Sequence, residues 1–190
     1  MPTVFKTEVF QYFAEEIFDA QPYTNQKLLM ISSVFESIDP SMLNRLANIE
    51  DTDQILMCFV KRNLFVQSVY EKKGWFFRYH QLFKDFLRSK LDSSIAQDEK
   101  NAVLNRAASL CALNGEWQNA ANLYLEAQNF QEAVTIIEKL GADLLKSGRT
   151  TDLSNLLTAL PKDIVSDRPW LLLYSSVARR FTGADENTVD

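Results

Sequence analysis

The sequence has little of the residue types from which most catalytic and metal sites are built. In 190 residues there are one histidine, two cysteines, five glycines and five prolines. Cys58 and Cys111 lack metal-ligand spacing and lie in apolar helical patterns, so we expect buried, unreactive thiols in the reducing cytoplasm. The scarcity of glycine and proline favours long helices joined by short connections.

The common catalytic motifs are also missing. The sequence has no GxxxxGK[ST] phosphate loop and no GxSxG, HExxH or CxxC motif. A catalytic triad would need His80, yet no serine has a recognisable nucleophile context. Acid pairs such as Glu15–Glu16 fit a solvated helix face better than general acid–base work. We therefore predict no enzyme activity, and no metal or cofactor held by this chain alone.

Long hydrophobic runs and a positive net charge are absent as well. The longest apolar runs, 28–31 and 170–174, are too short to cross a bilayer, and the N-terminus has no apolar signal core. The formal net charge of −5 repels the phosphate backbone of nucleic acids. These observations predict a cytoplasmic protein without membrane contact.

What is present begins with helical patterns. Apolar residues recur at helical spacing from Phe10 to Phe18, and the stretch 28–35 is apolar nearly all round, which predicts a buried helix. Asp39 begins a short third helix, and Asp51 or Thr52 can cap a fourth.

The period then changes to that of strands. Residues 64–70 and 75–80 are rich in β-branched and aromatic residues, and they flank a predicted four-residue loop at 71–74. A helix carrying Phe83 and Phe86 follows at once. Several helices followed by a β-hairpin is the order of a winged-helix domain, which we assign to residues 1–92.

Beyond Asp92 only helical periodicity is found, with predicted inward stripes that include Trp117 and Trp170. Glycines 115, 148 and 183 are 33 and 35 residues apart, close to the 34-residue tetratricopeptide period. We predict tetratricopeptide-like antiparallel helix pairs over residues 93–190, with generic helical hairpins as the alternative. The fold class is mainly α. The chain stops after the first helix of a third pair, which suggests a piece of a longer protein.

Direct DNA contact is not expected, although winged helices often bind DNA. The reading helix, 51–63, would present Asp51, Asp53 and Gln54, and the wing would add only Lys72 and Lys73. Few phosphate contacts on an acidic body give weak binding.

Three stretches carry a family resemblance: FQYFAEEIFDAQP, the aromatic block within NLFVQSVYEKKGWFFRYHQLF, and GEWQNAANLYLEAQNFQEAV. With these stretches the chain resembles the middle of the MalT-like, large ATP-binding LuxR-type transcriptional regulators, which are STAND ATPases. The resemblance implies a winged helix that closes over ADP bound to a nucleotide-binding core. It also implies a repeat domain that senses an inducer or protein partner, and self-association of the intact regulator.

The same resemblance implies a role for His80, since related ATPases contact the nucleotide phosphate with a winged-helix histidine. Arg78 is a weaker candidate for the same anion. The alternatives are a packing or helix-capping role for His80 and a surface ion pair with Glu71 for Arg78. Because the chain lacks the phosphate loop, ADP or ATP would bind only with the missing core. The sequence leaves two further functions open, a stand-alone tetratricopeptide-like adaptor and a winged-helix DNA-binding repressor, and it does not identify the inducer, the target genes or the oligomeric state.

Overall fold

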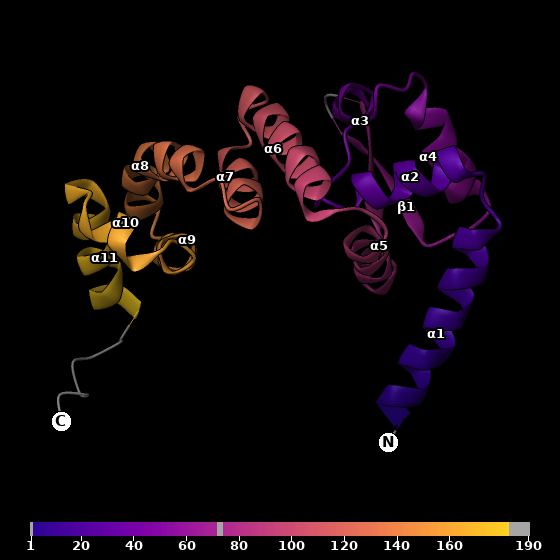
Figure 1. The fold of residues 1–190 in the computed structure, drawn as a ribbon, viewed down its shortest axis with the longest axis horizontal. Coiled ribbons are helices and arrows are strands. Elements are labelled where there is room, and N and C mark those ends of the chain that lie inside the picture. The colour runs from indigo at the N-terminus through magenta and orange to yellow at the C-terminus, as the bar shows by residue number, and fades with distance from the viewer. Residues whose placement is uncertain (1, 72–73, 183–190) are drawn as a thin grey trace. The chain divides into compact units, whose positions relative to one another are not determined.

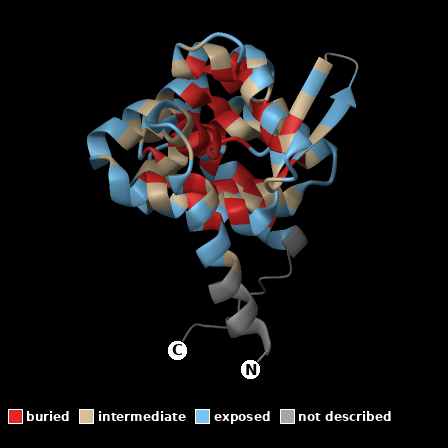
Figure 2. Ribbon diagram, turned by 90° about the vertical axis from the view of Figure 1, so that its right-hand side faces the viewer, coloured by how far each residue is buried: buried red, intermediate tan, exposed pale blue. Residues whose placement is uncertain are grey.

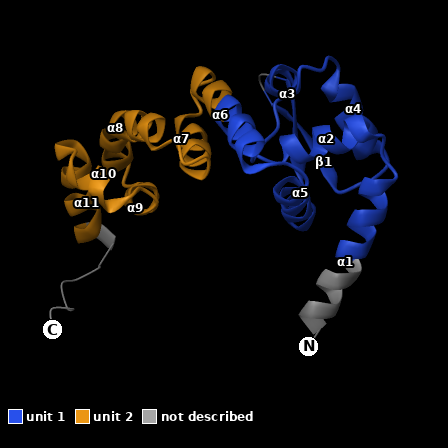
Figure 3. Cartoon of the chain, in the orientation of Figure 1, with its two compact units in different colours: residues 1–107 blue, residues 108–190 orange. Residues whose placement is uncertain are grey.

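A computed structural model describes residues 2–71 and 74–182 of the chain, with side chains from residue 10 to residue 180. The chain divides into two compact units, residues 1–107 and 108–190, and the division falls inside one helix (Figure 3). Figure 1 shows the succession of helices and the single hairpin of the described residues.

The first unit begins with four helices. They are α1 (Pro2–Asp19), α2 (Tyr23–Ser32), α3 (Pro40–Ala47) and α4 (Thr52–Lys61). Asp39 caps α3 as predicted, since its carboxylate accepts a hydrogen bond from the Ser41 N–H at 2.8 Å. At α4 the side chain of Asp51 makes no capping bond; instead Thr52 is fully buried, and its hydroxyl donates to Pro40 O and to Asn44 Oδ1.

The centre of this unit is the segment that the sequence predicted to be buried all round. Every residue from Leu28 to Phe35 is buried, and α2 packs against α5 (Gln81–Ser94). Figure 2 colours the buried positions of the chain red. The hydroxyls of Ser32 and Ser33 are satisfied there by the Leu29 and Met30 carbonyls. The prediction of a central buried helix is confirmed.

The hairpin joins β1 (Val66–Glu71) to β2 (Gly74–Tyr79) in antiparallel register, from the pair Val66–Tyr79 to the pair Glu71–Gly74. The predicted four-residue loop is therefore wrong, because Glu71 and Gly74 are themselves paired and only residues 72 and 73 lie between the strands. Ile38 extends the sheet by exchanging two backbone hydrogen bonds with Phe77, at 2.8 and 3.0 Å. Helices followed by this hairpin and α5 form a winged helix, so the predicted fold is confirmed.

The rest of the described chain is helical. It consists of α6 (Gln97–Leu113), α7 (Trp117–Glu126), α8 (Phe130–Lys146), α9 (Thr150–Thr158), α10 (Lys162–Ser166) and α11 (Pro169–Thr182). In the second unit α7 packs on α8, α8 on α9, and α9 on α11. Gly115 and Gly148 turn the chain at φ +80° and +72°, as the glycine spacing predicted, because the left-handed region favours glycine. The predicted turn at Gly183 lies outside the described residues.

Several side chains differ from the predicted inward stripes. Trp117, Trp170 and Phe13 are 41%, 61% and 51% exposed, so their predicted core positions are wrong. Among the described side chains of α11, Tyr174 and Ala178 are buried on the predicted stripe, and Leu171 takes the inward position that was predicted for Trp170. Cys58 is exposed, whereas Cys111 is buried. The expectation of two buried thiols is therefore wrong for Cys58.

The boundary predicted after Asp92 stays a prediction. Asp92 lies in the last turn of α5, and the division into compact units falls later, between Ala107 and Ala108 of α6. In the described part of the chain, no helix is both long and apolar enough to span a membrane.

Candidate functional site at the end of the wing

His80 is the residue that joins the wing to α5. Its backbone has φ −58° and ψ 138° and occupies the N-cap position of the helix. The His80 N–H donates to Phe65 O at 2.8 Å, and its carbonyl accepts from the N–H groups of Phe83 and Lys84 at 2.9 and 3.0 Å. These three bonds fix the position of His80 through its backbone and leave the imidazole out of the fold's hydrogen bonding.

The imidazole lies at the surface beside two phenyl rings. His80 is exposed and makes no capping bond, and its ring centroid lies 5.8 Å from that of Phe10 and 6.5 Å from that of Phe65. The His80 side chain does not cap the first amides of α5, and the N-terminus of a helix favours negative charge. A side-chain donor next to these amides can bind an anion chemically, so the predicted position of His80 suits an oxyanion ligand.

Arg78 lies two residues earlier, opposite Gln67 on β2. Its Nη2 is 3.9 Å from Glu71 Oε1, and both side chains are about half exposed. Such a long, hydrated pair contributes little to stability, on the order of 0–1 kcal/mol. The structure thus places the guanidinium on Glu71 and the imidazole on Phe10 and Phe65, and it records no bond that joins the two candidates. The assignment of either residue to a nucleotide stays a prediction.

Tyr79 fixes the end of the wing and was not among the predicted site residues. Its hydroxyl is 2.6 Å from the Ser32 hydroxyl of α2, and burial raises the pKa of this phenol well above its usual value. The hydrogen bond therefore joins neutral groups. The strand alternation was the available signal, because Tyr79 shares the inward parity of Phe77, which is fully buried.

Phe65 is the second residue that the sequence analysis missed. It has φ +58°, a region that bulky residues rarely adopt and that costs about 1–3 kcal/mol. Its ring packs on Phe10 at 4.7 Å and on Phe83 at 5.6 Å, and its carbonyl accepts the His80 N–H. The strained turn thereby ties α1, the start of β1 and α5 together at His80.

A groove of about 420 Å³ runs between α1 and α5 and begins at this junction, since Phe10 lines it and also contacts His80. Lys90 is the cation that lines the groove, but its ammonium already contacts other side chains. Its Nζ lies 2.7 Å from Glu15 and over the rings of Phe18 and Phe86 at 5.9 and 5.4 Å. With Glu15 and Asp85 also in its lining, the groove does not suit an anion. The described residues contain no group of three or more histidine, cysteine, aspartate or glutamate side chains that could hold a metal ion.

Comparison with known proteins finds named relatives for this chain. Residues 14–100 match the family model of the MalT winged helix domain. The chain is 26% identical over 164 residues to the HTH-type transcriptional regulator MalT of Vibrio campbellii, which covers 86% of this chain and 18% of that protein. It is 25% identical over 181 residues to the HTH-type transcriptional regulator AlkS of Ectopseudomonas oleovorans, covering 91% of this chain and 20% of that protein.

A relative of another class matches the same stretch. The serine/threonine-protein kinase PknK of Mycobacterium tuberculosis is 28% identical over 166 residues, covering 87% of this chain and 15% of the kinase. The chain thus spans a fifth or less of the length of these relatives.

Proposed function

Because residues 14–100 match the winged helix domain of MalT, we propose that this chain is the regulatory middle of an ATP-dependent transcriptional regulator. The observation that carries the proposal is that match, together with relatives named as transcriptional regulators that cover most of the chain. The chain itself would bind and transmit, while nucleotide and promoter would be bound by parts of the regulator outside it.

His80 is the residue through which we propose that the wing meets the nucleotide. Three features support this: an exposed imidazole, backbone bonds that hold His80 in place, and first amides of α5 that the His80 side chain leaves uncapped. A terminal phosphate of ADP or ATP in the nucleotide-binding core would accept a hydrogen bond from the ring and be stabilised by the end of α5. Arg78 can join by leaving Glu71, since that pair is weak.

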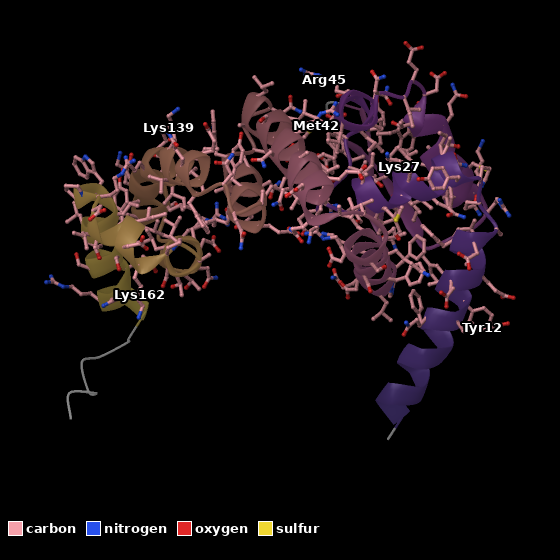
Figure 4. All side chains as sticks on the ribbon, in the orientation of Figure 1. Tyr12, Lys27, Met42, Arg45, Lys139 and Lys162 are labelled. Carbon is pink, nitrogen blue, oxygen red and sulfur yellow. The ribbon has the colours of Figure 1, made fainter. Side chains whose placement is uncertain are left out.

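The second unit is the part that we propose to sense an inducer or a protein partner. Its helices follow one another through short turns, as in helical repeat proteins, which bind ligands on extended surfaces. The exposed indole of Trp117, with the Lys139 ammonium 5.8 Å from its ring (Lys139 is labelled in Figure 4), shows that aromatic surface is available on this unit.

The first prediction tests the phosphate contact in the full-length regulator. We expect His80→Ala to speed the release of a fluorescent ADP analogue by about ten- to a hundredfold, because one charge-assisted hydrogen bond contributes about 1.5–3 kcal/mol. We expect Arg78→Ala to have a smaller effect. Release is measured by stopped-flow fluorescence, after thermal melts have shown that each variant is as stable as the parent.

Gln67→Ala is the matched control, because Gln67 is exposed on the same hairpin directly opposite Arg78. Its release rate should equal that of the parent protein. If His80→Ala also releases ADP at the parent rate, then the imidazole only packs on Phe10 and Phe65, and the proposed phosphate contact is wrong.

The kinase relative supports a second possibility, a module that serves outputs other than transcription. Since both a kinase and two regulators carry the stretch, the stretch itself fits a shared regulatory part better than either output. A peptide-binding adaptor fits the same surfaces of the second unit. A direct DNA repressor is less well supported, since Asp53 and Gln54 of α4 and the preceding Asp51 are exposed and bring no positive charge to the reading helix. The wing residues Lys72 and Lys73 lie outside the described residues. Salt-dependent binding of duplex DNA by this chain would favour the repressor.

A further inference from the structure

The outward face of α4 brings together apolar side chains, both charge signs and a hollow. The core of the first unit takes Thr52, Leu56 and Phe59 from α4. The outward side of the helix carries Asp53, Gln54, Met57, Cys58 and Lys61. Together with Trp75 and Phe77 of β2, the five residues line a groove of about 440 Å³. Trp75 is 47% exposed at its edge. We call this surface the α4 face.

The charges of the α4 face are arranged in order along the helix. Asp53, Met57 and Lys61 follow one another at intervals of four residues, which places them in one row. Asp53 lies in the first turn and Lys61 in the last, about 12 Å apart at 1.5 Å per residue. Each charge interacts favourably with the dipole of its own helix. That role alone explains neither the methionine between them nor the groove beside it.

We propose that the α4 face is a docking surface for a second copy of this chain, with the two α4 helices packed antiparallel about a two-fold axis near Met57. Antiparallel pairing of the row on itself sets Asp53 of each copy against Lys61 of the other. Met57 then meets Met57 at the axis, where a flexible thioether fills irregular space well. The surface is self-complementary, which is the requirement of an isologous interface.

The groove and the wing add apolar surface to the proposed contact between the two α4 helices. A side chain from the opposing helix can enter the groove between Met57 and Trp75, and the Trp75 ring can cover its edge. Aromatic residues and methionine are enriched in the cores of protein interfaces. The antiparallel arrangement also sets the negative end of each helix dipole beside the positive end of the other.

The charges of the α4 face disfavour two other occupants, a uniformly basic segment and a uniformly acidic segment. A basic segment would be attracted by Asp53 and repelled by Lys61, and an acidic segment would meet the reverse. Only a partner with the opposite order of charges satisfies both ends, and an antiparallel copy of the same helix has that order. The pairing needs neither nucleotide nor inducer, so it is independent of the function proposed above.

The test uses charge exchange in the full 190-residue chain. By sedimentation velocity at low ionic strength, we expect a concentration-dependent dimer. Asp53→Lys and Lys61→Asp should each weaken the association at least tenfold, because each sets like charges against one another. An equimolar mixture of the two variants should form a dimer again. In the mixed pair, one chain carries lysine at both positions and the other carries aspartate at both, so opposite charges face one another at each end.

The mixture separates docking from damage to the helix. Reversing a charge at the end of α4 can reduce its stability, but mixing two damaged chains would not restore association. If the parent chain stays monomeric up to about millimolar concentration, if the single variants dimerise like the parent, or if the mixture stays monomeric, the proposal is wrong.

Cys58 provides a second measurement, since it is exposed and adjacent to Met57 in sequence. In the proposed dimer the two Cys58 thiols lie close to the axis, so a short bismaleimide should cross-link them. Cross-linking should disappear in Asp53→Lys and in Lys61→Asp and return in their mixture. A cross-linking yield that is equal in parent, single variants and mixture would overturn the antiparallel arrangement.

Discussion

Gly141 lies where the ring of Tyr174 crosses α8. A Cβ at this position would overlap the Cδ2, Cε2 and Cζ atoms of that ring. The ring cannot move freely, because it is buried and its hydroxyl donates to Glu138 O at 3.3 Å. A glycine in the middle of a helix normally lowers stability. Here it allows α11 to approach α8 closely.

The second prediction concerns this contact. Gly141→Ala should lower the free energy of unfolding by about 1–3 kcal/mol, since the added methyl overpacks a filled space. Urea titration followed by the fluorescence of Trp117 and Trp170 measures the change. Tyr174→Leu in the same chain should reduce the cost of the methyl, and additive costs in that double-mutant cycle would show that the ring is not the cause.

The two cysteines differ in environment, and this gives the third prediction. Cys58 is exposed, while Cys111 is buried, and burial together with Glu116 raises the pKa of its thiol to about 12. Because the thiolate is the reactive form, one equivalent of Ellman's reagent should react in the native protein and two after denaturation. The native reaction should vanish in Cys58→Ser; a fast second equivalent in the native chain would contradict the burial of Cys111.

Among the elements, α3 and α4 begin in different ways. Asp39 caps α3 with its carboxylate, whereas Asp51 precedes α4 at φ +59° without a side-chain bond. Asn44 takes the place of the missing cap, because its Oδ1 accepts a hydrogen bond from the Thr52 N–H at 3.2 Å. The start of α4 is therefore joined to α3 through side chains.

The fourth prediction compares the two aspartates. Asp39→Ala should cost about 0.5–2 kcal/mol of stability, because it leaves the Ser41 N–H without its acceptor. Asp51→Asn should change stability by less than about 0.5 kcal/mol, since asparagine tolerates the left-handed region and no bond is lost. Equal losses in thermal unfolding would mean that the local geometry of the two caps is not what distinguishes them.

For the whole molecule, two groups with raised pKa contribute to the response to alkaline pH. Cys111 belongs to the second unit and Tyr79 to the first, and the pKa of each is raised mainly by burial. A raised pKa means that the folded state keeps its proton longer than the unfolded chain does. The stability from each group is complete below its unfolded pKa and is lost as pH rises toward its folded pKa.

The fifth prediction follows from that sign. The free energy of unfolding should fall as pH rises from about 9 toward 12, at up to about 1.4 kcal/mol per pH unit for the Cys111 thiol. Tyr79 should add a further loss above about pH 10. Cys111→Ala should flatten the first part of the profile in urea titrations at stepped pH, and an unchanged slope would show that another group titrates there.

The order of elements could be predicted because it depends on local signals. The all-round apolar stretch at Leu28–Phe35 requires burial, the glycines at 115 and 148 permit left-handed turns, and the change of period after residue 63 indicates strands. The position of His80 between wing and helix followed from the same change of period. Each of these depends on neighbours within a few residues.

Contacts between distant residues were decided only by the tertiary structure. Trp117 and Trp170 face outward because the stripe that packs is selected by the neighbouring helices, and a broad apolar helix face allows more than one choice. Phe10 meets His80, and Tyr79 meets Ser32, across 70 and 47 positions of sequence. Periodicity shows which face of a helix is apolar. Only the packed chain specifies which residues that face contacts, because packing depends on the shapes of both surfaces.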